Sequence, residues 1–312
     1  MRRRRTLAAV FAGLALLAAT GLAACTTGSA AAPGKVDVVA AFYPLQFVSE
    51  QVGGGHVAVT NLAKPGAEPH DLELSARQVG RVSDAEVIVY LKGFQPAMDD
   101  AVEQVGGDRA FDVSTAVPLL KAGESDHAHE GEEPEHGDES STDPHVWLDP
   151  TRLATIGQQV ADRLAAQDPD HAADYQANAA RLRTELTGLD QEYATGLATC
   201  QRRELVTSHA AFGYLADRYH LEQVGLTGIT PDTEPAPQRL ASVAEEAREH
   251  GATTIFFETL VSPKVADTIA AEVGARTAVL DPIEGLQPGA TGDYFSIMRT
   301  NLTALRTALD CS

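Results

Sequence analysis

Short runs rich in β-branched residues alternate with helical segments along most of this 312-residue chain. Such runs predict buried strands, and strands that are separated by helices pair in parallel. Eight strands are expected, four on each side of a long helical stretch: Val36–Phe42, His56–Leu62, Glu86–Leu91, Arg109–Val113, Glu204–Thr207, Gln223–Ile229, Thr253–Phe257 and Thr277–Leu280. The pattern therefore predicts an α/β fold with two lobes, each built on a parallel sheet flanked by helices.

The stretch between the two sets of strands is helical and long. After a helix over Thr151–Gln167, apolar residues recur every three or four positions from Tyr175 to Leu197 and form one continuous stripe. A helix of about 28 residues that begins at Pro169 measures roughly 42 Å. We expect this helix (169–198) to be a rigid link between an amino-terminal lobe (36–168) and a carboxy-terminal lobe (199–312), with a binding site in the cleft between them.

The first residues have the pattern of an export signal. Arg2–Arg5 precede an apolar run of Ala and Leu, which ends in Leu22-Ala23-Ala24-Cys25. This ending resembles the lipobox of bacterial lipoproteins, in which the cysteine becomes the lipid-modified amino terminus. We expect residues 1–24 to be a signal peptide, and residues 25–35 to be a flexible tether that anchors an extracytoplasmic protein to the membrane through Cys25.

Charge and cysteine content limit the partners and the redox environment. The chain has 44 acidic and 24 basic residues, a formal charge of -20, which argues against a nucleic-acid partner because phosphates attract clustered Lys and Arg. With Cys25 assigned to lipid, Cys200 and Cys311 remain, and two cysteines in an exported chain most often pair. Their disulfide would close a loop of about 110 residues, worth about 4–5 kcal/mol in the chain-entropy model.

Residues 121–142 interrupt the α/β pattern. The segment holds His127, His129 and His136 among many acids and lacks apolar periodicity, so its composition is typical of a disordered insertion. Histidine-rich tracts also bind metal ions, and we favour an accessory zinc-collecting role over a merely solvated loop.

Four polar residues stand in loops that follow predicted strands, two in each half of the chain: His70, His145, His209 and Asp281. His145 lies in the segment Asp143–Pro150, where prolines stiffen the loop. Ligands of parallel sheets bind beyond the carboxyl ends of strands, so these side chains are expected to converge. A single histidine after a strand is more often structural, but the four together favour a metal site.

Three imidazoles and one carboxylate form a suitable tetrahedral set for Zn²⁺, whereas Mn²⁺ prefers more oxygen ligands. Glu68 or a water molecule is an alternative to Asp281 as the fourth ligand. Glu258 is expected either to accept a hydrogen bond from His209 or to stabilise the start of the following helix.

The residues around these positions resemble the metal-specific cluster of solute-binding proteins of ABC transporters, in particular the zinc-uptake lipoproteins. The resemblance spans the mature chain and rests on six segments: Gly66–His70, Asp143–Pro150, Ser208–Tyr219, Ile229–Pro237, Phe257–Thr259 and Leu280–Pro282. It implies two α/β lobes joined by a long rigid helix. It also implies a metal site between the lobes, in which His70, His145, His209 and Asp281 match the ligand positions.

The residue at position 209 bears on the choice of metal. Manganese receptors of this family place a glutamate there, so His209 points to zinc. The family often has an acid-Pro-Ser-Pro segment after the first histidine, where this chain has Glu73-Leu74-Ser75-Ala76, and this difference puts the stiffness of the first loop in question.

The resemblance implies a non-catalytic, monomeric receptor that captures Zn²⁺ and delivers it to an ABC permease. A manganese receptor and an adhesin of the same fold are alternatives. A secreted zinc hydrolase, with three histidine ligands and an open position for water, is a further one. The sequence contains neither a His-Glu-x-x-His motif nor a nucleophile elbow, which argues against the hydrolase.

Overall fold

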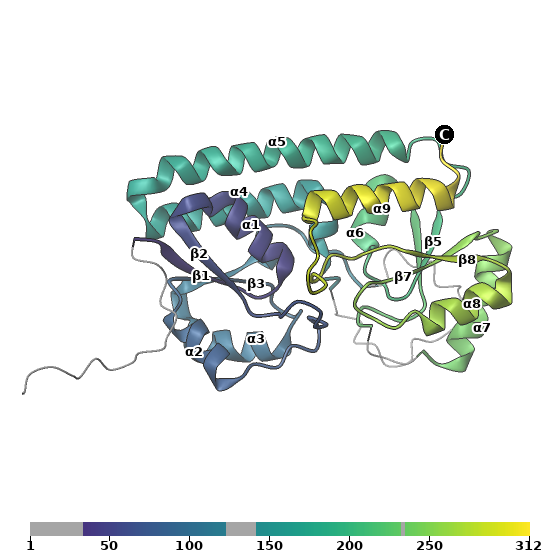
Figure 1. Ribbon diagram of the computed structural model, residues 1–312, viewed down its shortest axis with the longest axis horizontal. Helices are drawn as coiled ribbons and strands as arrows, with labels where there is room; N and C mark the ends of the chain where they lie inside the picture. Colours follow the sequence, from purple (N-terminus) through teal and green to yellow (C-terminus); the bar gives the residue numbers. More distant parts are fainter. Residues whose placement is uncertain (1–33, 123–141, 232–234) are drawn as a thin grey trace, which may run out of the picture. The chain divides into compact units, whose positions relative to one another are not determined.

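The computed structural model describes residues 34–122, 142–231 and 235–312. From residue 31 onward the chain forms one compact unit. This unit contains two four-stranded parallel sheets, which lie beneath the long helix α5 (Ala172–Gly196) in Figure 1. The predicted α/β fold with two lobes is confirmed. The predicted signal peptide, Cys25 and the histidines His127, His129 and His136 lie outside the described residues.

The amino-terminal lobe is built on a sheet with the strand order β2-β1-β3-β4. Its strands are β1 (Val36–Ala40), β2 (Val57–Asn61), β3 (Val87–Tyr90) and β4 (Ala110–Asp112). Its α-helices are α1 (Tyr43–Gly53), α2 (Ala76–Asp84) and α3 (Pro96–Ala101), the last of which continues as a π-helical turn over Val102–Gly106. Short 3₁₀ turns cover Gly54–His56, Gly107–Arg109, Val113–Thr115 and Val146–Leu148.

The carboxy-terminal lobe repeats this topology with the strand order β6-β5-β7-β8. Its strands are β5 (Glu204–Thr207), β6 (Glu222–Gly225), β7 (Thr254–Phe257) and β8 (Arg276–Val279). Its helices are α6 (Gly213–Tyr219), α7 (Pro237–Glu249), α8 (Lys264–Val273) and α9 (Tyr294–Leu309). In both lobes the first strand lies between the second and the third, so the strand order reverses there. Ligands of parallel sheets bind at such a point, beyond the carboxyl ends of the strands.

Two long helices, α4 (Pro150–Gln167) and α5, lie between the two sheets in the chain. Helix α4 begins with proline at its first position and is capped by the Asp149 carboxylate, which accepts the Thr151 N–H at 2.7 Å. A 3₁₀ turn over Pro169–His171 then leads into α5. The apolar stripe of α5 is buried as predicted, and it packs against α1, α4 and α9, so one helix contacts elements of both lobes.

One strand boundary in the carboxy-terminal lobe differs from the prediction: β6 ends at Gly225 rather than at Ile229. The backbone beyond β6 instead pairs with the loop after β5: Thr227 N–H donates to Ser208 O at 3.1 Å, and Ala210 N–H to Gly228 O at 2.9 Å. These hydrogen bonds hold the loop that carries His209.

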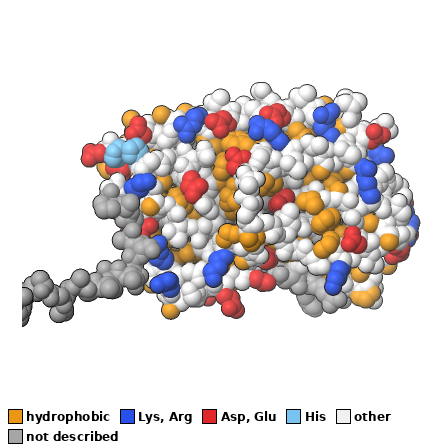
Figure 2. Space-filling model, in the orientation of Figure 1, with side chains coloured by type: hydrophobic (Ala, Val, Ile, Leu, Met, Phe, Trp, Pro, Cys, Tyr) orange, Lys and Arg blue, Asp and Glu red, His pale blue; other side chains and the backbone are white. Residues whose placement is uncertain are grey.

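A disulfide joins Cys200 and Cys311, which confirms the predicted pairing and ties the carboxyl terminus to the end of α5. Acidic and basic side chains are interspersed on the face of the molecule shown in Figure 2. Among the residues that the structure describes, every helix is too short or too polar to cross a membrane.

Candidate metal centre

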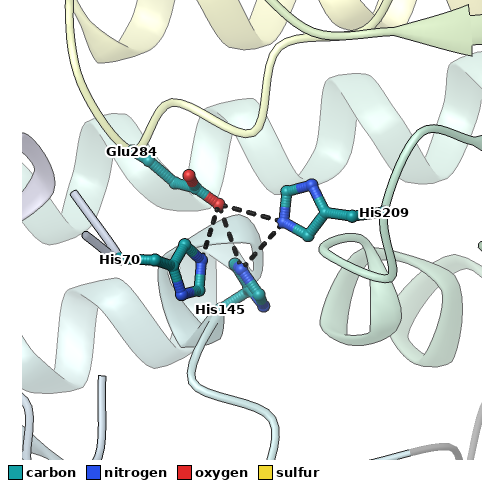
Figure 3. A group of neighbouring side chains, drawn as sticks. All are labelled: His70, His145, His209 and Glu284. Atoms are coloured by element: carbon teal, nitrogen blue, oxygen red, sulfur yellow. Dashed lines mark hydrogen bonds and ion pairs between the residues drawn. The ribbon is translucent and has the colours of Figure 1, made fainter. Parts of the chain in front are cut away.

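Four buried side chains meet at the junction between the lobes, as Figure 3 shows: His70, His145, His209 and Glu284. Glu284 Oε1 lies 3.1 Å from Nε2 of His145, 3.2 Å from Nε2 of His209 and 3.5 Å from Nε2 of His70. The Nε2 atoms of His145 and His209 are 3.4 Å apart. The structure thus brings the three predicted histidines together around a carboxylate.

His145 is held by a carboxylate on one side and by a rigid loop on the other. Its backbone N–H donates to Asp143 Oδ1 at 2.9 Å, and its Nδ1 atom lies 2.7 Å from the same oxygen. Trp147 anchors the loop, because its indole N–H donates to the carbonyl of Pro282 at 2.7 Å, and Tyr294 donates to the Trp147 carbonyl at 2.6 Å. Trp147 therefore links the His145 loop to the loop of Glu284.

His209 is oriented in the same way from the other lobe. Its Nδ1 atom lies 2.6 Å from Glu258 Oε1, so the predicted contact between these side chains is present. Thr207 donates to the His209 carbonyl at 2.7 Å, and Ser208 donates to Glu258. Because Nδ1 of both His145 and His209 is occupied by a carboxylate, Nε2 is the ring atom that each presents to the centre.

His70 lies on the loop after β2, with its ring against Phe94 at a centroid distance of 4.4 Å. Gln95 donates to the Pro69 carbonyl at 3.0 Å and supports this loop from beneath. Gly66 has a left-handed φ of 82°, and its N–H donates to the carbonyl of Leu286 at 2.8 Å. A side chain at residue 66 would approach Pro288 to 3.0 Å, so glycine lets the His70 and Glu284 loops pack closely.

Glu284 follows a strained turn. Ile283 has φ of 61°, a conformation that β-branched residues rarely adopt. Asp281 stabilises this turn: its Oδ1 accepts the Ile283 N–H at 2.8 Å, and its Oδ2 accepts the Thr259 hydroxyl at 2.9 Å. Asn301 also pairs with both backbone groups of Asp281, at 3.0 and 2.7 Å. Strain of this kind occurs where a side chain must be aimed at a site.

The prediction of Asp281 as the fourth member of the group is corrected by this geometry. Asp281 lies outside the group, and Glu284, three residues later, occupies the place expected for the carboxylate. The prediction took the acid nearest the end of β8, but that carboxylate is used to hold the turn. Glu68, the alternative, accepts the His70 N–H at 3.1 Å. Its burial, followed by the charge of Glu284, raises the pKa of Glu68 to about 9.

The pKa values of the residues in the centre are shifted by burial and by the charges of their neighbours. Burial would raise the pKa of Glu284, but the charge of His209 and the close approach of the three imidazoles hold it well below its ordinary value. Burial would lower the pKa values of His145 and His209, but the neighbouring carboxylates outweigh this effect and raise both. Burial lowers the pKa of His70. The centre is therefore electrostatically suited to hold positive charge among buried groups.

The distances between the ligand atoms, and two buried polar atoms without a hydrogen-bond partner, fit a cation with tetrahedral coordination. Ligand atoms about 2.0–2.1 Å from Zn²⁺ lie about 3.3–3.4 Å from one another in a tetrahedron. The distances from Glu284 Oε1 to the three Nε2 atoms, and the distance between Nε2 of His145 and Nε2 of His209, range from 3.1 to 3.5 Å. His70 Nε2 and Glu284 Oε2 are buried without a hydrogen-bond partner in the described part of the chain, a situation that costs free energy unless a ligand is bound.

Comparison with known proteins gives a family and several relatives. The family model described as "zinc-uptake complex component A periplasmic" (ZnuA) matches residues 38–308. The zinc-binding protein AdcA of Streptococcus pyogenes serotype M3 is 37% identical over 293 residues, which cover 89% of this chain and 57% of that protein. The high-affinity zinc uptake system protein ZnuA of Bacillus subtilis is 36% identical over 315 residues, which cover 96% of this chain and 98% of that one. This chain thus spans little more than half the length of the streptococcal relative.

Solved structures agree with the fold. The Zn(II)-bound ZnuA-like domain of Streptococcus pneumoniae AdcA superposes with a TM-score of 0.74 at 34% identity, covering 89% of this chain and 100% of that one. The laminin-binding protein Lmb of Streptococcus agalactiae, described as having adhesin and metal transporting activity, has a TM-score of 0.77 at 28% identity, with coverages of 88% and 99%. The family model covers most of the chain, and these relatives match it over nearly its whole length; this chain belongs to the ZnuA family of zinc-uptake components.

Proposed function

We propose that this protein captures Zn²⁺ outside the cytoplasmic membrane and delivers it to the permease of an ABC importer. The observation that carries this proposal is the buried group of His70, His145, His209 and Glu284, in which Glu284 Oε1 lies 3.1–3.5 Å from the three Nε2 atoms, close to the edge of a zinc tetrahedron. Membership of the zinc-uptake family and the printed names of the relatives support the same cargo.

Three imidazoles favour Zn²⁺ over Mn²⁺. Imidazole nitrogen is a good ligand for zinc, whereas manganese favours carboxylate, carbonyl and water oxygens and a higher coordination number. His209 contributes one of the nitrogens, and its ring is fixed by Glu258. We therefore infer that the choice of metal depends on a neutral, rigidly oriented imidazole at this position.

Each lobe contributes two ligands, so binding holds the lobes together. His70 and His145 precede α5 in the chain, and His209 and Glu284 follow it. Because α5 is one continuous helix against elements of both lobes, we propose small movements of the ligand loops rather than a wide hinge motion. Similar solution scattering of the zinc-free and zinc-bound forms is expected, and a large domain rotation would contradict this proposal.

The expected signal peptide and Cys25 suit an extracytoplasmic protein. We propose that residues 1–24 are removed and that lipid on Cys25 anchors the chain, as a monomer, beside its permease. A streptococcal relative is named a zinc-binding lipoprotein. We infer no catalytic role, because four protein ligands leave no open position for a reacting water. Adhesion remains a second candidate, since a related structure is described as having adhesin activity.

Parallel titration of the mature chain with Zn²⁺ and Mn²⁺ tests the proposal. The test compares the unmodified protein, His209→Ala and a deletion of residues 122–141. We expect one tight zinc equivalent that survives the deletion, weakens sharply in His209→Ala and is not matched by manganese. Loss of tight binding with the deletion, or equal binding of manganese, would overturn it. Binding to immobilised laminin tests the adhesin alternative separately.

A further inference from the structure

A second group of metal-binding side chains lies at the opposite end of the carboxy-terminal sheet. Glu204 begins β5, Glu222 begins β6, and His250 follows the last residue of α7. One potential ligand atom of each residue lies within 4.8 Å of those of the other two. The first group lies beyond the carboxyl end of β5, so the length of that strand, roughly 10 Å, separates the two groups.

The sheet register brings the two carboxylates together. Glu204 pairs with Glu222 in the parallel ladder of β5 and β6, and register partners of neighbouring strands present their side chains to the same face of a sheet. The Nδ1 atom of His250 lies 3.0 Å from Glu204 Oε2. Two oxygens and one nitrogen are thereby placed on one face by three different elements.

The Glu204 side chain supplies an independent indication of a ligand. Only 6% of its surface is exposed, and its Oε1 atom is buried without a hydrogen-bond partner among the described residues. A buried carboxylate that faces other carboxylates is stabilised by a cation placed between them.

Two nearby arginines make hydrogen bonds to backbone carbonyl groups. Arg203 donates to the carbonyls of Leu197 and Ala198, at 2.9 and 3.1 Å. Arg202 donates to the Gly251 carbonyl at 3.3 Å and lies 3.8 Å from Asp310. His250, which is charged only when protonated, contacts the Glu204 carboxylate.

We propose that Glu204, Glu222 and His250 form a second binding site for Zn²⁺, separate from the site between the lobes. An imidazole with two carboxylates suits zinc, whereas magnesium and calcium select oxygen ligands alone. The gap of 3.0 Å between His250 Nδ1 and Glu204 Oε2 is close to the edge of about 3.3 Å of a zinc tetrahedron. Water completes the coordination, because about half of the His250 side chain (47%) is exposed.

This second site is the weaker of the two. It has three protein ligands instead of four, and all belong to one lobe, so its occupancy does not require the lobes to approach each other. Zinc there would connect β5, β6 and the turn after α7. The site would fill only when zinc is more abundant than the first site requires.

The experiment counts zinc equivalents in the mature full chain by titration against a chromogenic chelator. Glu204→Gln and His250→Gln are compared with His56→Gln, a matched control. His56 is also a partly exposed histidine paired to a carboxylate, 3.1 Å from Asp174, but it is outside both groups. The signal of the His250 ring is followed by NMR during the same titration, so each site is observed separately.

Loss of one weak zinc equivalent in both Glu204→Gln and His250→Gln, but not in His56→Gln, supports the second site. A zinc-dependent shift of the His250 signal after the tight equivalent is filled supports it further. Unchanged zinc counts in both variants, or a His250 signal that does not respond to zinc, overturns it. The tight equivalent, which His209→Ala removes, reports on the proposed receptor function independently of these outcomes.

Discussion

The two groups of histidine and glutamate at the ends of β5 have similar ligand types but different surroundings. In the group between the lobes, two of the three imidazoles are oriented by a second carboxylate, Asp143 for His145 and Glu258 for His209. In the group of Glu204, Glu222 and His250, the imidazole instead contacts a proposed ligand directly and is half exposed. From this difference we expect orientation and burial, more than the residue types, to make the first proposed site bind zinc more tightly than the second.

The two groups also differ in what they connect. The first joins four loops from both lobes around Glu284, which is almost fully buried. The second joins neighbouring elements of one lobe. Occupancy of the first site is therefore coupled to the arrangement of the lobes, whereas occupancy of the second affects the carboxy-terminal lobe alone.

Replacing Glu284 by glutamine should have the largest effect. The change preserves the shape of the side chain but removes the negative charge that faces all three imidazoles. Loss of a partner outside the ligand set already costs about 10–100-fold in metal affinity, so we expect Glu284→Gln to lower zinc affinity by more than about 100-fold. Calorimetric or chelator-competition titration checks this, and an affinity within a few-fold of the unmodified protein would exclude Glu284 as a ligand.

Lowering the pH should weaken the first site strongly. The pKa values of His145 and His209 are raised, since their carboxylate partners outweigh burial, and zinc must displace their protons. Zinc affinity should therefore rise with pH through neutrality, by about 10- to 100-fold per pH unit for one or two displaced protons. Stability of the zinc-free protein should change in the opposite direction: the contribution of these histidines is complete at low pH and is lost as pH rises through their folded-state pKa values. Titrations and unfolding measurements between about pH 6 and about pH 8.5 would reveal both trends, and a flat affinity profile would contradict the first.

Replacing Asp143 by asparagine should have an intermediate effect. The change removes the charge that fixes the His145 ring through a 2.7 Å contact, and zinc affinity should fall by about 10–100-fold. Asp168→Asn is the matched control, because Asp168 contacts His171 Nδ1 at the same distance, 2.7 Å, away from the centre. Equal zinc affinities in the two variants would show that the carboxylate behind His145 has no role in orientation.

The strands and the histidines could be predicted from the sequence because each depends on local patterns. Buried parallel strands appear as short β-branched runs, His209 directly follows the end of β5, and prolines mark the loop of His145. Glu284 could not be predicted in this way, because the direction of its side chain depends on the left-handed backbone conformation of Ile283. A β-branched residue rarely adopts this conformation, so the sequence gives no sign of it. The available signal was a second acid in the same loop, followed by Gly285.

The group of Glu204, Glu222 and His250 was missed for a different reason. The sequence predicted that β6 starts at Gln223, which leaves Glu222 outside the strand, whereas the structure starts it at Glu222 in register with Glu204. Strand register depends on pairing between distant segments, so the two glutamates appear unrelated in the sequence.

Replacing Asp281 by asparagine should separate support of the loop from metal binding. Asp281 accepts hydrogen bonds from Ile283 N–H and the Thr259 hydroxyl but lies outside the ligand group. We expect the variant to lose about 1–2 kcal/mol of unfolding free energy, with a decrease in zinc affinity smaller than that of Asp143→Asn. Urea unfolding and zinc titration measure the two quantities. A zinc affinity as low as that of Glu284→Gln would restore Asp281 as a ligand.

Replacing His250 by glutamine should have the smallest effect on the zinc-free protein. Its imidazole is half exposed, so solvent screens its contact at 3.0 Å with the buried carboxylate of Glu204, and we expect this pair to contribute about 1 kcal/mol or less. We therefore expect the melting temperature without zinc to remain close to that of the unmodified protein. With zinc in excess of one equivalent, the unmodified protein should gain further stability that the variant lacks, because a ligand stabilises only the form that binds it. Identical melting curves of the two proteins at every zinc concentration would show that the group of Glu204, Glu222 and His250, at the start of β5, binds no zinc.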